Sequence, residues 1–497
     1  MFDQLTRNRW VRNRYTRRVA HWVRRILALL SATSAASGAT AQGAVSAPTM
    51  PTWLQDEMRA LAAIEPELLP PGTGIERYAF YSVPMDTRQG AVYAILSDAI
   101  GEASYTHVLL VPWLKPGGAD RGILYHASAI AESDPAARIL VLTTEPASSP
   151  WASRLPARAH LVDFGNIAAL LDFNQQVNVM VRVLLQLRAP TVHLVNSRVG
   201  WDAILRHGLA LTQHSRLFAS LFCDDYDQQM NPVGYARDYL RYCYPHLSAI
   251  ISDNSRYPQI WSRELGIPHA SFTFIPFPYD GRVAEGAGRA ISTEGAGRVL
   301  WAGRLDRQKR PDILALIAEQ MPDVHFDVYG AQVMSGAAVQ DLSRLRSLPN
   351  LTLHGEFQRL EEVATPEHFA YLHTTAWEGT PTILFDVAAA KLPICAPQVG
   401  GIVDFLAEQD MVERHDDVAA FVSQLKLLQS SAQLRDERVQ RQLASLRRNR
   451  GWKDFTASLE ALEGYLTVHS RTSASLTGAS LAAAGSEGGA LQRARQG

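Results

Sequence analysis

The chain has 497 residues, of which 47% are hydrophobic and 20% are charged, and its formal net charge is −1. This length and apolar content predict two domains, each with a buried core. The near balance of charge gives no electrostatic case for a nucleic acid partner, and three widely spaced cysteines fit neither a disulfide framework nor a zinc site.

The N-terminal segment is strongly basic. Residues 1–25 contain eight arginines and one aspartate, and a short apolar run follows at residues 26–30. That run is too short to cross a membrane. We expect residues 1–45 to form an extension that is disordered or touches an anionic membrane surface, with an export signal as the alternative.

The next part of the chain alternates apolar runs with helical patterns. A buried strand is expected over residues 107–114, followed by a turn at Gly117 and Gly118 and a helix whose start is flanked by Asp120 and Arg121. Glycines allow a backbone to approach a ligand closely. Further strands are expected over residues 138–144, 160–165, 190–197, 217–223, 249–254 and 272–277, which is typical of a parallel sheet covered on both faces.

A segment rich in glycine and alanine, residues 281–298, predicts a flexible link between two domains. The strand RVLWAG comes next, then Arg304, and five residues later Lys309 at the start of a helix. Ligands of doubly wound folds bind at the carboxyl ends of strands, so these cations predict a phosphate site. Taken alone, the same residues also fit a solvated charged loop.

The segment WEGTPTILFD predicts the end of a strand near Trp377 and the start of a helix at Gly379 and Thr380, where unpaired amides favour an anion. Glu378 precedes that helix, and Asp386 lies eight residues later, about 12 Å along it at about 1.5 Å per residue. One carboxylate can then hold sugar hydroxyls and the other a ribose diol, with phosphates between them.

The C-terminal part predicts a tight turn and a final helix. Gly400 and Gly401 indicate a turn that needs positive φ. An amphipathic helix is expected over residues 448–466, with Trp452 and Phe455 as core or interdomain contacts. Residues 468–497 have the composition of a disordered tail.

Several of these motifs together resemble a known family. The Arg304 and Lys309 pair, HGEF at residues 354–357, the Glu378 and Asp386 pair, and KLPICAPQVGGIVDFL resemble the retaining glycosyltransferases of the GT-B fold, the large "group 1" (family 4-like) group. The order and spacing agree over about 110 residues. The resemblance implies an α/β fold of two Rossmann-like, doubly wound domains that face a cleft.

The resemblance also implies roles for the site residues. In that family an arginine and a lysine hold the donor diphosphate, one acid contacts the sugar hydroxyls and a second acid binds the ribose. These roles fall on Arg304, Lys309, Glu378 and Asp386, with Asp386 standing where the family has Glu. The expected catalytic residues are Glu378, Arg304 and Lys309, and the expected donor site adds Gly117, Gly118, Gly379, Thr380 and Asp386.

One expected residue is missing. Many members of the family carry a histidine after a middle strand of the first domain, where this chain reads LFASLFCDDYDQQ. Either Asp224 or Asp225 serves in its place, or neither does. His193, His207 and His214 are expected to be structural or surface residues.

The predicted division of the chain follows from these motifs. It places the extension at 1–45, an acceptor domain at 46–280, the link at 281–298, a donor domain at 299–447, a helix crossing back at 448–467 and the tail at 468–497. No cofactor and no metal are expected, because no DxD-type motif stands at a strand end.

The expected function is retaining transfer of a sugar, of the hexosyltransferase type, from a nucleotide-sugar donor to a glycan or lipid-linked acceptor. The family points to cell-surface polysaccharide or glycoconjugate biosynthesis in the cytoplasm, with the basic N-terminus able to contact the inner face of the membrane. A cleaved export signal would separate the enzyme from cytosolic donor. The alternatives are a non-catalytic nucleotide-sugar-binding protein and a sugar-nucleotide epimerase or phosphorylase on the same fold.

Overall fold

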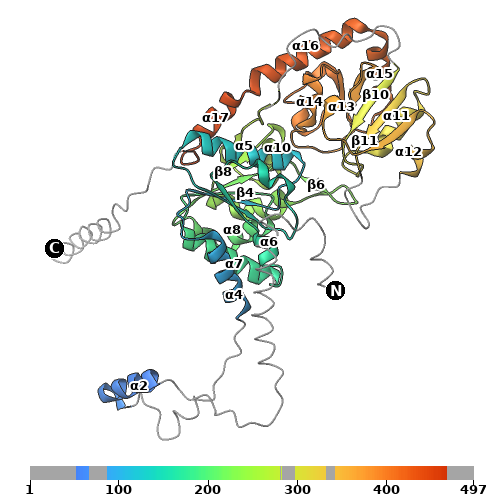
Figure 1. The fold of residues 1–497 in the computed structure, drawn as a ribbon. Helices are drawn as coiled ribbons and strands as arrows, with labels where there is room; N and C mark the ends of the chain where they lie inside the picture. The colour runs from blue at the N-terminus through green and yellow to red at the C-terminus, as the bar shows by residue number, and fades with distance from the viewer. Residues whose placement is uncertain (1–51, 67–86, 280, 282–296, 332–341, 467–497) are drawn as a thin grey trace, which may run out of the picture. The chain divides into compact units, whose positions relative to one another are not determined.

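The computed structural model describes residues 52–66, 87–279, 281, 297–331 and 342–466 (Figure 1). The predictions for residues 1–45, for residues 282–296 of the link and for the tail at 468–497 lie outside these ranges. By its internal contacts the chain divides into two units, one combining residues 1–99 with 170–175 and the other holding all remaining residues. The first unit includes helix α2 (Thr52–Ile64), and the second contains both large sheets.

The first sheet has seven strands that all pair in parallel, in the order β3-β2-β1-β4-β5-β8-β9. Strands β1, β2 and β4 are buried along their whole length, as expected where helices cover both faces of a parallel sheet. Their bounds are β1 (His107–Val111), β2 (Ile139–Thr143), β3 (Ala159–Val162), β4 (Thr191–Val195), β5 (Arg216–Ser220), β8 (Leu247–Ser252) and β9 (Phe272–Phe274).

The second sheet has six parallel strands in the order β12-β11-β10-β13-β14-β15. The strand order reverses between β10 and β13, and in the first sheet it reverses between β1 and β4. Ligands of open α/β sheets bind outside the carboxyl ends of the strands at such switch points. The bounds are β10 (Arg298–Ala302), β11 (His325–Tyr329), β12 (Leu351–Gly355), β13 (His368–Leu372), β14 (Ile394–Pro397) and β15 (Met411–Val412).

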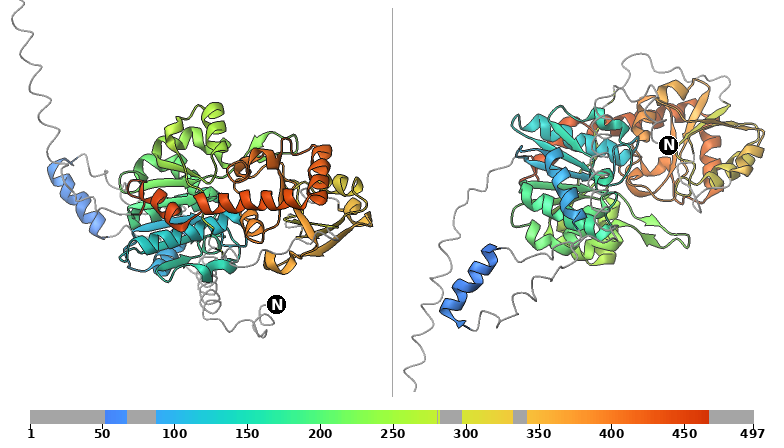
Figure 2. Two further views of the ribbon diagram at one scale, coloured as in Figure 1. Left: turned by 90° about the horizontal axis from the view of Figure 1, so that it is seen from above. Right: turned by 60° about the horizontal axis from the view of Figure 1, so that its bottom comes forward.

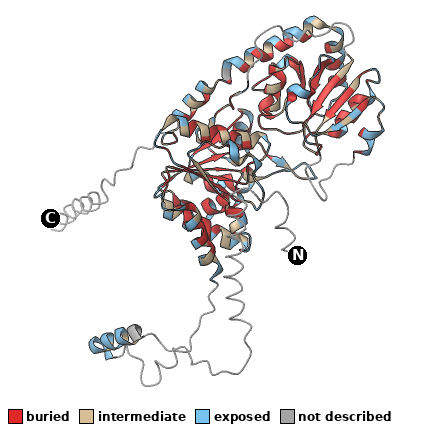
Figure 3. Ribbon diagram, in the orientation of Figure 1, coloured by how far each residue is buried: buried red, intermediate tan, exposed pale blue. Residues whose placement is uncertain are grey.

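Helices pack on these sheets, and buried residues concentrate on the strands and on the helix faces turned toward them (Figures 2 and 3). Local sequence sets several helix ends. Ser197 caps α8 by accepting from the amide of Gly200, and Gly266 ends α10 with φ +71°. The larger of these helices are α5 (Gly118–Ser133), α7 (Phe173–Leu187), α8 (Arg198–Leu211), α9 (Tyr235–Cys243), α10 (Arg256–Leu265), α11 (Pro311–Glu319), α15 (Val418–Ser430), α16 (Ala432–Asn449) and α17 (Trp452–Glu460). Helix α4 (Arg88–Ile100) belongs almost entirely to the first unit. The short ones are α6 (Phe164–Ile167), α12 (Ser343–Ser347), α13 (Leu360–Val363) and α14 (Ile383–Ala389).

The predicted α/β class with two Rossmann-like sheets is confirmed. Individual strands are shorter than predicted, and the strand expected over 107–114 ends at Val111. The continuous helix predicted over 448–466 is wrong, because α16 ends at Asn449 and α17 begins at Trp452. Between them Arg450 leaves the helical conformation, and its carbonyl accepts from the amide of Tyr279 at 2.9 Å. A tertiary hydrogen bond thus replaces the next helical one.

The C-terminal segment packs on the first sheet, with α17 beside α5 in Figure 1. Phe455 is buried against Tyr125, and the indole of Trp452 donates to Glu132 on α5 at 2.7 Å. The carbonyl of Tyr465 lies 2.7 Å from Nε2 of His107 on β1. These contacts give the two aromatic side chains the packing role expected from the sequence.

Candidate functional site

The central feature of the site is an ion pair at the switch point of the second sheet. Lys309 lies in the loop after β10, and Glu378 lies in the segment after β13, so both stand at the carboxyl edge. Nζ of Lys309 pairs with Oε2 of Glu378, and the two side chains are only 11% and 14% exposed. The same carboxylate oxygen accepts from Thr375 Oγ1 at 3.1 Å and lies 3.4 Å from Nε2 of Gln308. The carboxylate is therefore fixed by three donors.

The backbone around this pair is held by the segment that follows β13. The hydroxyl of Thr374 donates to the carbonyl of Lys309 at 2.8 Å, and the amide of Ala376 donates to the carbonyl of Gln308 at 2.9 Å. The prediction that the strand continues to Trp377 is therefore wrong. The strand ends at Leu372 because the residues after it bond to the 308–309 loop instead of continuing the ladder.

Arg304 occupies the exposed side of the same loop. Its side chain is 47% exposed, and Nε lies 3.3 Å from Oδ2 of Asp306. Its guanidinium also donates to Oε1 of Gln308 at 2.6 Å. Arg304 thus stands at the edge of the site in contact with water, while Lys309 stands inside it.

The predicted helix start at Gly379 and Thr380 is wrong. Helix α14 begins at Ile383, and the amide of Thr380 donates to Oδ2 of Asp253 at 2.8 Å. The hydroxyl of Thr380 donates to the carbonyl of Asp253 at 2.7 Å. The carboxylate of Asp253, which follows a strand of the first sheet, therefore accepts a hydrogen bond from the amide that we expected to bind a ligand anion.

Asp386 consequently lies in the first turn of α14, and the predicted spacing of more than two helical turns from Glu378 is also wrong. The carboxylate of Asp386 lies 3.5 Å from the guanidinium of Arg121 on α5, with both side chains 27% exposed. Arg121 was expected only to flank a helix start. It instead provides a contact between the two sheets.

The Gly117 and Gly118 turn lies after β1, at the switch point of the first sheet. A Cβ atom added to Gly118 would lie 3.7 Å from Oγ1 of Thr382, so this turn approaches the segment before α14. Gly117 is extended and needs no positive φ. Asp120 accepts from the amide of Lys115 at 2.8 Å, and burial raises its pKa to about 6.

Asp253 was missed by the sequence analysis. It follows β8 and is 2% exposed, and burial raises the pKa of its carboxyl to about 7, with the negative charge of Glu378 adding to the shift. Burial, together with the charges of Glu378 and Asp253, also raises the pKa of the Cys223 thiol well above its usual value. The signal that could have identified Asp253 is the run of three polar residues, Ser252 to Asn254, at the end of an apolar strand.

Of the two aspartates considered in place of the missing histidine, Asp224 has structural partners and Asp225 lies in a hairpin. The carboxylate of Asp224 is buried and accepts from Arg237 at 3.0 Å and from the indole of Trp261 at 2.8 Å, so it anchors local structure. Asp225 opens a two-stranded hairpin of β6 (Asp225–Tyr226) and β7 (Pro232–Val233). Asp227 accepts from the amides of Gln229 and Asn231 within that turn.

The three histidines singled out in the sequence are structural or on the surface. Ring atom Nε2 of His193 lies 2.8 Å from the hydroxyl of Ser220 in the core. His207 and His214 are exposed. The expectation for these three residues is confirmed.

The turn predicted at Gly400 and Gly401 is confirmed. Gly400 has φ +51°, and a Cβ atom there would lie 1.7 Å from the carbonyl oxygen of Glu378. The amide of Gly401 donates to the carbonyl of Gly379 at 2.8 Å. Glycine is required at 400 because the backbone of the Glu378 segment passes directly against it.

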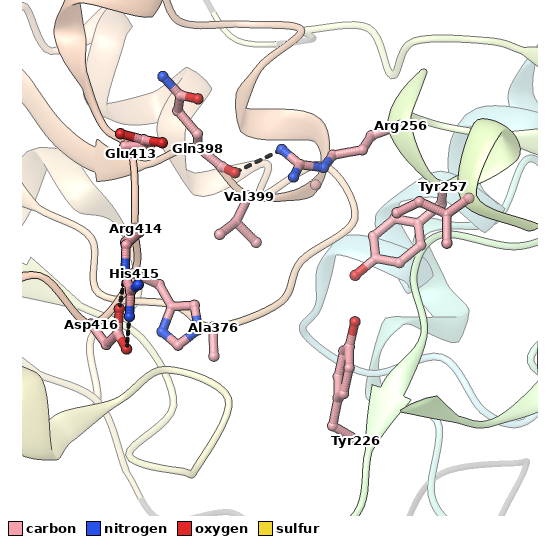
Figure 4. A pocket seen from close by; sticks show the side chains of 12 residues that line it. Tyr226, Arg256, Tyr257, Ala376, Gln398, Val399, Glu413, Arg414, His415 and Asp416 are labelled. Atoms are coloured by element: carbon pink, nitrogen blue, oxygen red, sulfur yellow. Dashed lines mark hydrogen bonds and ion pairs between the residues drawn. The ribbon is translucent and has the colours of Figure 1, made fainter. Parts of the chain in front are cut away.

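A cavity of about 380 Å³ adjoins this segment (Figure 4). Its walls come from both sheets of the second unit, with Tyr226 and α10 on one side and the loops after β14 and β15 on the other. Ala376 and Gly400, which flank Glu378 in space, line it.

Two further properties concern the residues that the structure describes. Within them, no cluster of three or more histidine, cysteine or carboxylate side chains is arranged to hold a metal ion. No helix in these ranges combines the length and apolar character needed to cross a membrane.

No protein-family model and no curated protein match this sequence. Solved structures do share its fold. TarM is 9% identical with a TM-score of 0.57, over 74% of this chain and 99% of that chain. HepE from Anabaena, solved in complex with UDP-glucose, is 15% identical with a TM-score of 0.54, over 72% and 98%.

A third similar structure is the lipopolysaccharide outer core galactosyltransferase WaaB, which is 13% identical with a TM-score of 0.50, over 71% of this chain and 99% of that chain. These neighbours are glycosyltransferases of the GT-B fold. The chain therefore has the GT-B fold, with two Rossmann-like sheets.

Proposed function

We propose that this protein is a glycosyltransferase that moves a sugar from a nucleotide-sugar donor to an acceptor hydroxyl with retention of configuration. The observation that carries the proposal is the grouping of Arg304, Lys309 and Glu378 at the switch point of the second sheet. Two cations and one carboxylate on adjacent loops match the charges of a sugar diphosphate, which carries anionic phosphates beside neutral hydroxyls.

Lys309 and Arg304 divide the work of holding the diphosphate. Lys309 supplies a point charge from inside the site, and Arg304 supplies a planar fork from its rim. Lys309 is paired with Glu378. A bound diphosphate would share that charge, and the negative charge that develops on the leaving group would meet cations already in place.

Glu378 is proposed to bind the hydroxyls of the transferred sugar. Its carboxylate is held by Lys309, Thr375 and Gln308, so its orientation is set before the sugar arrives. Asp386 is proposed to bind the ribose, with Gly117, Gly118, Gly379 and Thr380 beside the phosphates. No divalent cation is proposed, because Arg304 and Lys309 supply the countercharge.

The proposal extends to the setting of the reaction. HepE has been solved with UDP-glucose, which makes UDP the first nucleotide to test. The acceptor is proposed to be a glycan or lipid-linked glycan in cell-surface polysaccharide or glycoconjugate synthesis. The cytoplasm is the proposed location, since nucleotide-sugars are made there, with the basic N-terminal segment contacting the membrane.

The first experiment measures thermal unfolding with UDP, GDP, ADP and TDP in turn. A ligand that binds only the native state at a hundredfold excess over its dissociation constant stabilises it by about 2.7 kcal/mol. Arg304→Ala should abolish the shift. Arg344→Ala is the matched control, because Arg344 is also an exposed, ion-paired arginine but lies on α12, which precedes β12 and so leads to the amino edge of the sheet. No shift with any nucleotide would refute the proposal.

The second candidate is a protein that binds nucleotide-sugar without turnover. The observation in its favour is that Glu378 is already satisfied by three donors. Incubation with UDP-sugar and acceptor glycans, analysed by mass spectrometry, separates the two. A transferase makes an acceptor-bound product that is lost in Glu378→Gln, whereas a binding protein makes none and keeps its affinity in that variant. An epimerase or phosphorylase would alter the donor without labelling an acceptor.

A further inference from the structure

The cavity beside the Glu378 segment has no role in the donor site described above. Ala376 and Gly400 line it, and the backbone of Gly400 lies against the carbonyl of Glu378. The carboxylate of Glu378 pairs with Lys309, and neither residue is part of the cavity lining. The cavity therefore shares one wall with the residue proposed to hold the transferred sugar, yet lies outside the loop that carries the two cations.

Two tyrosines form the side of the cavity that comes from the first sheet. Their hydroxyls point toward one another in Figure 4 and are hydrogen-bonded to each other. The ring of Tyr226 packs on Trp377 with centroids 5.1 Å apart, and Tyr257 is 4% exposed. Burial raises the pKa of both phenols, so each stays neutral and can donate or accept a hydrogen bond.

The charged side chains of the cavity balance one another. Arg256 donates to the carbonyl of Gln398 at 2.8 Å, and Arg414 pairs with Asp416 at 2.9 Å. Glu413 is the second acid, which gives two arginines and two acids in the lining. Burial and nearby Arg310 lower the pKa of His415, so its ring is neutral near pH 7. The lining has no net charge with which to select an ion.

We propose that this cavity binds a neutral sugar residue of the acceptor glycan. The tyrosine, isoleucine and valine side chains of the lining suit the apolar parts of a sugar ring, and its polar side chains suit the sugar hydroxyls. A volume of about 380 Å³ lies in the range of about 300–1,000 Å³ that is common for small-ligand sites. The inference rests on the proposed function and adds the chemical class of the acceptor.

The test uses saturation-transfer NMR of the full chain with neutral methyl glycosides of glucose, galactose, mannose and N-acetylglucosamine, and with methyl glucuronide as a charged probe. Ile260→Trp fills the cavity from α10 without touching the residues assigned to the donor. Gln259→Trp is the matched control, because Gln259 is the exposed neighbour on the same helix and is absent from the lining.

The expected result is saturation transfer to at least one neutral glycoside, its loss in Ile260→Trp and its retention in Gln259→Trp. The inference would be overturned by saturation transfer to the charged probe alone, or by no saturation transfer to any glycoside. Equal saturation transfer in the natural protein and in both variants would also overturn it. The UDP-induced thermal shift, measured on the same samples, separates this failure from failure of the proposed function. A normal UDP shift in Ile260→Trp shows that the donor site is intact, whereas no shift in the unaltered protein rejects the donor site itself.

Discussion

Asp253 offers the sharpest prediction, because a buried carboxylate should make stability depend on pH. Its pKa is raised from 3.8 to about 7, chiefly by burial, while the unfolded chain ionises near the ordinary value. Between these two values the folded protein binds more protons than the unfolded chain. The free energy of unfolding therefore falls as pH rises from about 4 to about 7 through this group.

The magnitude follows from the shift. A difference of about 3 pH units, at about 1.4 kcal/mol per unit, corresponds to about 4 kcal/mol. Asp253→Asn removes the titration but changes hydrogen bonds to Thr380 and Asn254, which adds an offset that does not vary with pH. The stability of the variant relative to the natural protein should thus increase with pH by up to about 4 kcal/mol, whatever the offset.

The assay compares melting temperatures of the two proteins from pH 4.5 to 8.5. For a domain of 150–250 residues, 1 kcal/mol shifts the melting temperature by about 2–4 °C, so the difference should grow by several degrees. Buried histidines such as His126, whose pKa burial lowers to about 3, destabilise the fold as pH falls. That effect is common to both proteins and cancels in the difference. A difference that stays constant across this range would refute the reasoning.

The remaining predictions concern the loops around the ion pair. Lys309→Met should lower the free energy of unfolding, measured in urea, by up to about 3 kcal/mol, because it leaves the Glu378 carboxylate without its cation. The double variant Lys309→Met/Glu378→Gln should recover much of that loss. Gly400→Ala should cost more than Gly101→Ala, since both have positive φ but only at 400 would the new Cβ strike backbone; equal melting temperatures would contradict this. Asp253→Ala should strengthen UDP binding, measured by calorimetry, by at most about 1.5–3 kcal/mol, because the Thr380 amide that now donates to Asp253 could then donate to a phosphate. Weaker UDP binding in a folded variant would show that the Asp253 carboxylate positions the loop instead.

The features that were predicted correctly from the sequence are those that follow from local hydrophobic patterns and from the order of the strands. Apolar runs identified all seven strands of the first sheet and two of the second, β10 and β13. A cation and an acid placed after two strands were rightly expected at one edge of one sheet. Lys309 and Glu378 meet there because β10 and β13 are adjacent at the switch point. Their direct pairing was not predicted, since each had been assigned to a different part of a ligand.

The errors lie where a distant residue overrides a local preference. Thr380 has the sequence context of a helix start, but Asp253, which lies 127 positions away in the chain, takes its amide. Arg450 interrupts a helical pattern because its backbone bonds to Tyr279. The contact of Asp253 with Thr380 leaves no trace in the local periodicity. The break after α16 does have a local signal, because Gly451 directly follows Arg450.

These long-range contacts share a consequence for the site. Asp253 binds Thr380 from the end of β8, Gly118 approaches Thr382 from the turn after β1, and Arg121 reaches Asp386 from α5. The short stretch between Glu378 and α14 is therefore fixed by the first sheet although it belongs to the second. A donor bound at this stretch would exchange contacts with both sheets at once, since its phosphates would compete with the carboxylate for the same amide. On the proposed function, donor binding and the contact between the two sheets would be coupled through one short loop, and the stability of that contact would become part of the affinity for the donor.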